Sequence, residues 1–437
     1  MKIKLIYPEW GNYPLLYRRY IPTLGLITVA SLTPPEIDIS ITDERIEPVD
    51  FSEDVDLVGI STMTCQSKRA YEIARIYKEK GVTVVLGGVH PSLLPEEVSN
   101  FCDSVVIGEA EESWPKLIED FRKGSLQKFY SCQGKDTKTP SLRWELYSNK
   151  GYLPVSPVQL VKGCPLDCEF CSVPSAFGNT FRMRSMEDIS REIEDAGAYL
   201  FLINDNIHLA RRRTSEIFKF LSSSGKEWVG LAPLNIAEDS NYISSLRKSG
   251  CWALYVDFSP WLSATLSKKV DSMQVEKDTE YIRRMKDAGI KILASFIFGF
   301  DHDDKGSFER IVNFAKNNGI DEAEFHILTP YPKSRLWYKL LSEGRLLETD
   351  FSFYTTTHAV FKPKQMTPEE LIEGFNYAWK AFYPSESYIE TPHGPVIKTL
   401  TAFPMKKEDL LPKVFRKEYN ARWLRSVLKE EVYEKDT

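Results

Sequence analysis

Short apolar runs and amphipathic stretches alternate along the first 125 residues. The apolar runs have the length of strands and cover residues 2–8, 37–43, 55–62, 82–88 and 103–111. Helical patterns lie between them, at 23–33, 67–81 and 94–101. The run 55–62 is apolar throughout, which is typical of a strand buried on both faces. This alternation predicts a parallel, doubly wound sheet of the Rossmann or flavodoxin type.

A second series of strand patterns follows a polar, proline-containing segment at residues 126–155. We interpret that segment as a linker or a segment that wraps around a neighbouring domain. Apolar runs then recur, each separated by a helical stretch, at 155–161, 198–205, 228–234, 252–258, 290–300 and 322–330. About six βα units of this kind predict a partial (β/α)6 barrel, whose functional groups belong at the carboxyl ends of the strands.

The last part of the chain, residues 346–437, is rich in aromatic and charged residues, with helices expected at 367–383 and 418–435. Its aromatic side chains either form ordinary core or cover an apolar substrate. The predicted divisions are therefore a Rossmann-like domain (1–125), the linker or wrapping segment (126–155), a barrel (156–345) and a mainly helical domain on the substrate side (346–437).

The bulk composition is that of an ordinary soluble protein. Of the 437 residues 42% are hydrophobic and 27% charged, and the formal net charge of −6 does not suggest binding to nucleic acid. No apolar run reaches the roughly 18–20 residues that a membrane span requires. The chain opens on a strand pattern instead of a signal peptide. We expect a cytoplasmic protein without a membrane span.

Three of the seven cysteines stand close together in "KGCPLDCEFC", residues 162–171. Cys164, Cys168 and Cys171 have C-x3-C-x2-C spacing and follow a predicted strand. Structural zinc takes four protein ligands, and the closest histidine in sequence is His208. A [4Fe–4S] cluster held by three thiolates leaves one iron open to another ligand. We interpret the loop as such a cluster site, with a zinc or purely structural role as the alternative.

This loop resembles the hallmark of the radical S-adenosylmethionine (SAM) superfamily, in which an aromatic residue, here Phe170, precedes the last cysteine. The resemblance implies that the open iron chelates SAM and that the reduced cluster cleaves it to a 5′-deoxyadenosyl radical. Arg182 and Arg184 follow the loop, where a solvated basic turn and a functional role are equally compatible with the sequence.

Four later segments are similar to the superfamily's SAM-binding strands. "FLINDNIHL" (201–209) resembles the segment that positions the SAM amino group, and a helix cap is the alternative. "LYVDFSPWLSATLSKKV" (254–270) lacks a glutamate that is usual there. "SFIFGFDHDD" (295–304) and "ILTPYPKSRLWYKLLSEGR" (327–345) match the fifth and sixth strands, with Gly299 facing the site. The SAM contacts implied are Phe170, Asn204, Asp205, Asn206, Ser259, Ser295 and the backbone near Leu328.

The amino-terminal domain resembles the cobalamin-binding domain that is fused to radical SAM barrels. The similarity rests on "PTLGLITVAS", "GISTMT", "GGVHPSLLPEE" and "GEAEESW". Hydroxyls and glycines at strand ends would let a flat macrocycle approach the backbone, although a flavodoxin-like nucleotide site could use similar loops. The cobalamin contacts implied are Ser61, Thr62, Met63, Thr64, Gly87, Gly88, Val89, His90, Gly108 and Glu109.

One departure concerns the cobalt ligand. Many cobalamin domains carry D-x-H-x-x-G, whose histidine binds cobalt, whereas the matching region here reads "DERIEP", residues 43–48. We expect base-off cobalamin without histidine ligation, with Met63, Thr64 and Cys65 near its lower face. His90 is expected to line the pocket.

The resemblance implies an enzyme with a [4Fe–4S] cluster, SAM and cobalamin as cofactors. The leading interpretation is a C-methyltransferase that moves a methyl group from methylcobalamin to an unactivated carbon after hydrogen abstraction by the 5′-deoxyadenosyl radical. A cobalamin-dependent cyclase or ring-rearranging enzyme is the alternative, and a non-catalytic cobalamin or iron–sulfur sensor is a remote one. The expected partners are an electron donor such as flavodoxin or ferredoxin and a substrate that is a lipid, a small molecule, or a peptide or protein side chain.

Overall fold

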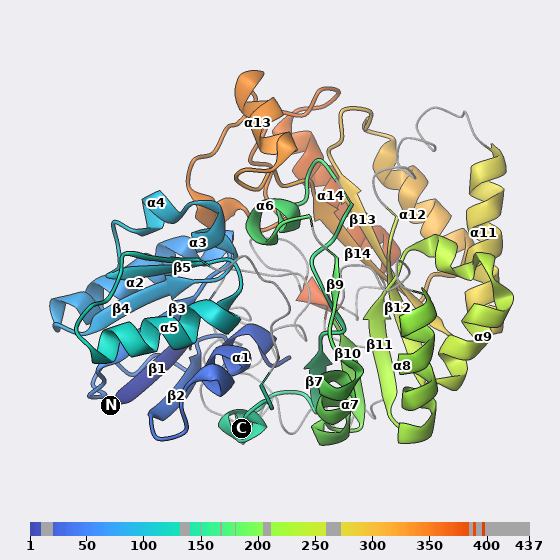
Figure 1. Ribbon diagram of the computed structural model, residues 1–437. Helices are drawn as coiled ribbons and strands as arrows, with labels where there is room; N and C mark the ends of the chain where they lie inside the picture. Colours follow the sequence, from blue (N-terminus) through green and yellow to red (C-terminus); the bar gives the residue numbers. More distant parts are fainter. Residues whose placement is uncertain are drawn as a thin grey trace, which may run out of the picture.

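The protein consists of two parallel α/β units that lie side by side, the first blue to teal and the second green to orange in Figure 1. This computed structural model describes residues 1–9, 21–131, 140–148, 150–166, 168–179, 181–203, 211–258, 272–383, 388–389 and 396–397. The two-unit arrangement agrees with the predicted fold class.

The first unit is a six-stranded parallel sheet in the order β2-β1-β3-β4-β5-β6. Its first five strands are those predicted: β1 (Lys2–Tyr7), β2 (Asp38–Asp43), β3 (Leu57–Ser61), β4 (Thr83–Gly87) and β5 (Ser104–Ile107). Helices α1 (Leu24–Leu32) and α5 (Ala110–Arg122) cover one face, and α2 (Ser67–Glu79) and α4 (Pro95–Val98) the other. Apolar layers on both faces explain why β3 and β4 are almost continuously apolar.

Part of the segment predicted as a linker or wrapping segment belongs to this unit. The strand β6 (Phe129–Ser131) pairs with β5 at the edge of the sheet. Further along, the 3₁₀ turn η3 (Trp144–Tyr147) lies against α1, where the Tyr147 hydroxyl donates to the Thr23 carbonyl at 2.8 Å. This part of the segment therefore wraps around the first unit.

The second unit is an open parallel sheet in the order β14-β13-β12-β11-β10-β7. Its strands follow one another in chain order, as in a partial (β/α)6 barrel, and each of them was predicted: β7 (Val155–Val158), β10 (Tyr199–Leu202), β11 (Glu227–Leu231), β12 (Cys251–Asp257), β13 (Lys291–Phe298) and β14 (Glu322–Ile327). The helices on its outer face are α7 (Met186–Asp195), α8 (Arg211–Ser224), α9 (Ser240–Lys248), α11 (Ser272–Asp287) and α12 (Ser307–Asn317), with the 3₁₀ turn η5 (Leu234–Glu238) between α8 and α9.

The two faces of this sheet differ in what they bury. Alternate residues such as Phe296 and Phe325 pack under the outer helices in the largest core of the protein. The inner face carries a smaller apolar cluster that includes Val229 and Leu293. Ile46, from the first unit, packs into that inner cluster and joins the two units.

The described residues of the carboxy-terminal part are mainly helical. It comprises α13 (Arg335–Ser342), the 3₁₀ turn η6 (Phe351–Phe353) and α14 (Pro368–Phe382), which packs on α12 and β14. A capping box between Thr367 and Glu370 and a proline at the first turn fix the start of α14. A small hairpin, β15 (Tyr388–Ile389) and β16 (Val396–Ile397), follows. The helix expected at 418–435 lies outside the described residues.

Candidate active site

The predicted cobalamin contacts gather at the carboxyl ends of strands β3, β4 and β5 of the first sheet. This side of the sheet is called the cobalamin edge below. The Thr62 amide donates to the Gly87 carbonyl at 2.9 Å, and the His90 amide, in α3 (Val89–Leu93), donates to the Thr62 carbonyl at 3.2 Å. The Gly108 amide donates to Ser92 Oγ at 2.8 Å. In a sheet of order 2-1-3-4-5 the ligand site lies at this edge, beside the point between β1 and β3 where the strand order reverses.

A side chain at position 88 would collide with the backbone at the end of the neighbouring strand, β3. The φ of Gly88 is +101°, and a Cβ built there would lie 2.9 Å from both the backbone nitrogen and the carbonyl oxygen of Thr62. The sequence predicts that glycines at this edge let the macrocycle approach the backbone. At Gly88 the structure adds a steric reason, because the glycine lets the turn pack against the end of β3.

Two buried polar atoms at this edge lack a hydrogen-bond partner among the residues that the structure describes. They are Thr64 Oγ1, in the 3₁₀ turn η2 (Thr64–Gln66), and His90 Nδ1. A buried polar atom without a partner costs about 1–3 kcal/mol. A ligand with amide side chains, as cobalamin has, could satisfy both atoms, so the residues present fit this cofactor.

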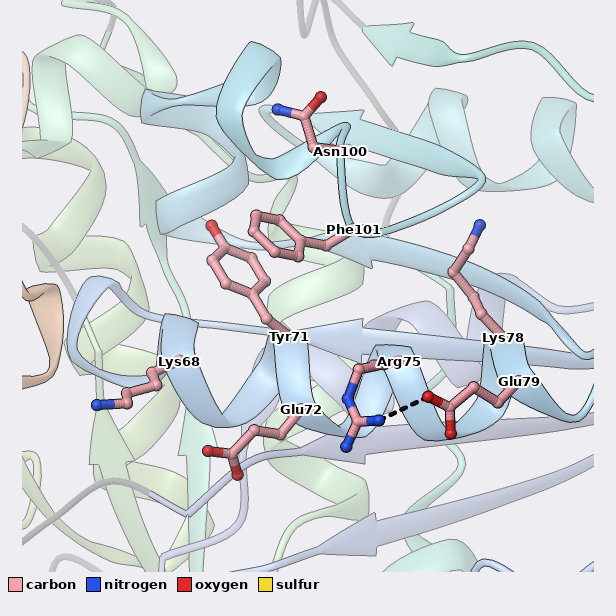
Figure 2. A pocket seen from close by; sticks show the side chains of 8 residues that line it. All are labelled: Lys68, Tyr71, Glu72, Arg75, Lys78, Glu79, Asn100 and Phe101. Atoms are coloured by element: carbon pink, nitrogen blue, oxygen red, sulfur yellow. Dashed lines mark hydrogen bonds and ion pairs between the residues drawn. The ribbon is translucent and has the colours of Figure 1, made fainter.

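His90 is completely buried, and its other ring nitrogen is already bound. Nε2 lies 2.9 Å from the Tyr71 hydroxyl, whose single proton is donated to Glu97, so Nε2 is the donor in the contact with Tyr71. The Tyr71 ring also stacks on Phe101, with centroids 3.8 Å apart (Figure 2). The two rings line a groove of about 640 Å³ on the outer side of α2 that contains none of the predicted cofactor contacts.

The region that matches D-x-H-x-x-G offers no lone pair to cobalt at the histidine position. Arg45 stands there, and it forms a buried bidentate pair with Asp43, with Nε–Oδ1 2.8 Å and Nη2–Oδ2 2.5 Å. A guanidinium has no acceptor atom to offer to a metal. Burial raises the pKa of Cys65 to about 12, so this thiol stays protonated at neutral pH and is a poor metal ligand.

The three clustered cysteines lie in a loop closed by a short antiparallel hairpin, β8 (Val161–Lys162) and β9 (Arg182–Met183). The Cys171 amide donates to the Cys168 carbonyl at 3.1 Å, which forms a tight turn. Phe170 packs edge-on against Phe300, with ring centroids 6.1 Å apart, at the carboxyl end of β13. The loop is thereby attached to the second sheet at the edge where the resemblance predicts SAM.

The same loop is also bound to the start of α13 and the residues before it. The Leu336 amide donates to the Glu169 carbonyl at 2.8 Å, and Ser175 Oγ, in α6 (Val173–Phe177), donates to the Lys333 carbonyl at 2.9 Å. Within the described ranges no group of three or more His, Cys, Asp or Glu side chains is close enough to hold a metal ion. The assignment of Cys164, Cys168 and Cys171 as cluster ligands therefore rests on their thiolate chemistry and spacing, which suit an iron–sulfur cluster.

Arg182 and Arg184 do not form a solvated basic turn. Arg184 pairs with Glu192 at 2.6 Å, and both side chains are less than a tenth exposed. Arg182 binds both carboxylate oxygens of Glu109, at 2.9 and 2.5 Å. The predicted cobalamin contact Glu109 therefore faces the stem of the cysteine loop.

Of the predicted SAM contacts on the strands, Ser295 and Leu328 are buried. The Leu328 amide donates to the Phe298 carbonyl at 2.8 Å, and Gly299 beside it has a φ of +110°. Asn204, Asp205, Asn206 and Ser259 lie outside the described residues.

A buried polar network on the inner face of the second sheet was not singled out from the sequence. The Tyr255 hydroxyl donates to Glu324 Oε2 at 2.9 Å, and His326 Nε2 lies 3.3 Å from the same oxygen. His326 Nδ1 is 3.2 Å from Thr356 Oγ1. Thr356 has a φ of +63°, a strained conformation for a β-branched residue. Glutamate and histidine inside the otherwise apolar stretch "EAEFHIL" were the available sequence signal.

Two family models match this chain in the order of the two units. The B12 binding domain matches residues 20–118, and the Radical SAM superfamily matches residues 158–315. The chain belongs to the cobalamin-dependent radical SAM family. Its cofactors are accordingly cobalamin, SAM and a [4Fe–4S] cluster.

Several proteins resemble this chain over most of its length. The chain is 29% identical to bacteriochlorophyllide d C-12(1)-methyltransferase from Chlorobaculum tepidum, over 85% of this chain and 84% of that protein. It is 24% identical to anaerobic magnesium-protoporphyrin IX monomethyl ester cyclase from Rubrivivax gelatinosus, over 90% of this chain and 79% of that protein. The fold resembles the radical S-adenosylmethionine methyltransferase TsrM from Kitasatospora setae, solved with cobalamin and a [4Fe–4S] cluster (TM-score 0.61, 14% identity, 78% of each chain).

Among the described residues of this cobalamin-dependent radical SAM protein, no helix is both long and apolar enough to cross a membrane.

Proposed function

We propose that this protein is a C-methyltransferase, which uses SAM both as the methyl source for cobalamin and as the source of a 5′-deoxyadenosyl radical. The observation that carries the proposal is the direct contact between the two cofactor regions. Glu109, at the end of β5, pairs with Arg182, in the stem of the cysteine loop. The similarity to a named methyltransferase supports the same reaction class.

We further propose roles for the chain's own residues. Cys164, Cys168 and Cys171 would hold the cluster, and the inner face of β12 to β14, with Ser295, would receive SAM. When bound, the cluster supplies the electron that cleaves SAM, and cobalamin supplies the methyl group. The protein's task is to exclude water and to hold the reacting groups in line. An external electron donor such as flavodoxin or ferredoxin would be needed to reduce the cluster.

The absence of a histidine from the motif that usually binds cobalt suits a methyl donor. Neither Arg45 nor Cys65 is a suitable ligand, and His90 Nε2 is bound to Tyr71. We infer base-off cobalamin without histidine ligation, as expected from the sequence. Contacts with Ser61, Thr62, Met63 and Gly108 would come from the loops at the same edge.

Cyclisation or ring rearrangement without methyl transfer is the second candidate, supported by the similarity to a magnesium-protoporphyrin ester cyclase. The two reactions give products of different mass. With SAM labelled as CD3 in its methyl group, a methyltransferase adds the label to its product and forms S-adenosylhomocysteine. A cyclase adds no label.

The first test uses bacteriochlorophyllide d as a probe, since a relative is named for it. Reduced holoenzyme, CD3-SAM and the probe are analysed by mass spectrometry, with the Cys164→Ala variant as control. Labelled product formed only by the wild type supports the proposal. If this probe is not a substrate, a cell extract fractionated by mass replaces it as the source of substrate. A product that carries no CD3 label and has the mass expected for ring closure contradicts methylation.

A further inference from the structure

Four charged residues join the cobalamin domain to the stem of the cysteine loop. Glu109 and Glu111 stand at the β5–α5 junction, and Lys162 and Arg182 are paired across the β8–β9 hairpin. Arg182 binds Glu109 through two nitrogens, at 2.9 and 2.5 Å. Lys162 pairs with Glu111 and lies 3.8 Å from Glu109 Oε2.

These ion pairs are shielded from solvent. The four side chains are 7–21% exposed, with Glu111 the most buried. A bidentate arginine–carboxylate pair also fixes orientation, which a lysine on the surface cannot do. By contrast, the pair between Lys68 and Asp350, whose side chains are 65% and 33% exposed, should contribute little.

The ion pairs link the cobalamin edge to the base of the cysteine loop. Gly108 and Glu109 end the strand whose loop lies at the cobalamin edge, and Lys162 and Arg182 are the two residues that close the loop of Cys164, Cys168 and Cys171. Movement of Glu109 would therefore be transmitted to the base of the cysteine loop. The hairpin is only two residues long on each side, and these ion pairs join its charged side chains to the first unit, whereas Phe170, Glu169 and Ser175 attach the loop to the second.

We propose that Glu109, Glu111, Lys162 and Arg182 form a clamp that fixes the cysteine loop relative to the cobalamin domain, and so sets the spacing of the two metal centres. These are positioning residues, and Glu109 acts through Arg182 instead of by contact with cobalamin. The spacing of the metal centres rests on the proposed function, but the clamp itself is a property of the protein without cofactors.

Hydrogen–deuterium exchange of the full-length apoprotein tests the clamp without any activity. Glu109→Gln and Arg182→Ala should each accelerate exchange in residues 163–181 by at least about tenfold, because loss of one partner leaves a shielded charge unpaired. The exchanged pair Glu109→Arg/Arg182→Glu should restore most of the protection. Lys68→Ala is the matched control, and it should leave the loop unchanged.

The loaded protein provides a second readout. In wild type, the electron spins of cob(II)alamin and the reduced cluster should show a magnetic coupling with a narrow distribution. Glu109→Gln should broaden this distribution, and the double variant Glu109→Arg/Arg182→Glu should narrow it again. Unchanged exchange and unchanged coupling in both single variants would overturn the clamp. Failure of methyl transfer in the wild type would instead contradict only the proposed function.

Discussion

The side chains at the cobalamin edge differ in the atoms that they could offer to a metal. His90 is enclosed, with Nε2 bound to the Tyr71 hydroxyl, and its Nδ1 has no partner within the described ranges. The residue at the histidine position of D-x-H-x-x-G is Arg45, which is bound to Asp43. The histidine position of the motif thus holds no cobalt ligand, and we propose that His90, which lies outside the motif, serves packing and the wall of the pocket.

His90→Gln should leave the electron paramagnetic resonance spectrum of bound cob(II)alamin unchanged. Glutamine can still hydrogen-bond to Tyr71 and fills a similar volume, so the domain should keep its cobalamin. A nitrogen hyperfine pattern from cobalt that is present in wild type and absent from the variant would show that His90 ligates cobalt.

Asp278, on α11, makes folding pH-dependent at a position remote from the site. Burial raises its pKa to about 6 from 3.8, although Gln274 donates to it at 3.0 Å. In the unfolded chain the carboxyl ionises at lower pH than in the folded protein. Stability from this group is therefore complete below pH 4 and is lost as pH rises to about 6.

Asp278→Asn should flatten the fall in thermal midpoint between about pH 4 and pH 6 and raise the midpoint at pH 7. Asp287→Asn, on the same helix, is the control because that carboxylate is 62% exposed. An equally steep fall in both variants would mean that another group is responsible.

At the scale of elements, the strand-end turns are set by contacts with neighbouring strands. Gly88 shows this most clearly, since its missing side chain makes room for the backbone of Thr62. Gly124 also has a positive φ, +68°, but a Cβ built there would have no described neighbouring atom within 4 Å. Comparing an alanine substitution at the two positions therefore separates the cost of a positive φ from the cost of a steric clash.

Gly88→Ala should destabilise the apoprotein by about 1–3 kcal/mol more than Gly124→Ala, because only the first adds an overpacked contact. It should also reduce the cobalamin content after reconstitution. Chemical denaturation and the visible spectrum measure the two effects. Equal destabilisation by both substitutions would mean that the clash at Thr62 is relieved at no cost.

The same scale shows what the sequence could predict. The strands of both sheets, apart from β6 and the two-residue pairs, were identified because each has a run of apolar residues of strand length. β6 has only three residues, and β8 and β9 two each, so no periodic pattern exists to read. Glu109 could be placed at a strand end, but its partner Arg182 is 73 residues away. Partners so distant in the chain depend on how the two units pack.

The inner face of the second sheet also holds contacts that the sequence could not predict. Ser295 was expected there because its segment resembles a SAM-binding strand of the superfamily, whereas the link from Tyr255 through Glu324 and His326 to Thr356 joins three separate parts of the chain. Thr356 is held in an unfavourable backbone conformation partly by the bond from the Ile327 amide to its carbonyl, at 2.7 Å. Backbone strain of this kind has no signature in the sequence.

Over the whole molecule, the two units are joined at several places. Ile46 enters the inner cluster of the second sheet, Tyr152 donates to Asp43 at 2.9 Å, and Glu109 binds Arg182. Contacts of these kinds, apolar and polar, give the two cofactor regions a defined relation. A fixed relation is what a reaction shared by two cofactors requires.

The central claim is that one protein directs SAM into two reactions, methyl transfer to cobalamin and radical formation. The most direct measurement is mass spectrometry of the reduced holoenzyme incubated with CD3-SAM. Our account predicts CD3-cobalamin, S-adenosylhomocysteine and 5′-deoxyadenosine from the wild type, with no 5′-deoxyadenosine from Cys164→Ala, Cys168→Ala or Cys171→Ala. 5′-Deoxyadenosine without CD3-cobalamin or S-adenosylhomocysteine would contradict it.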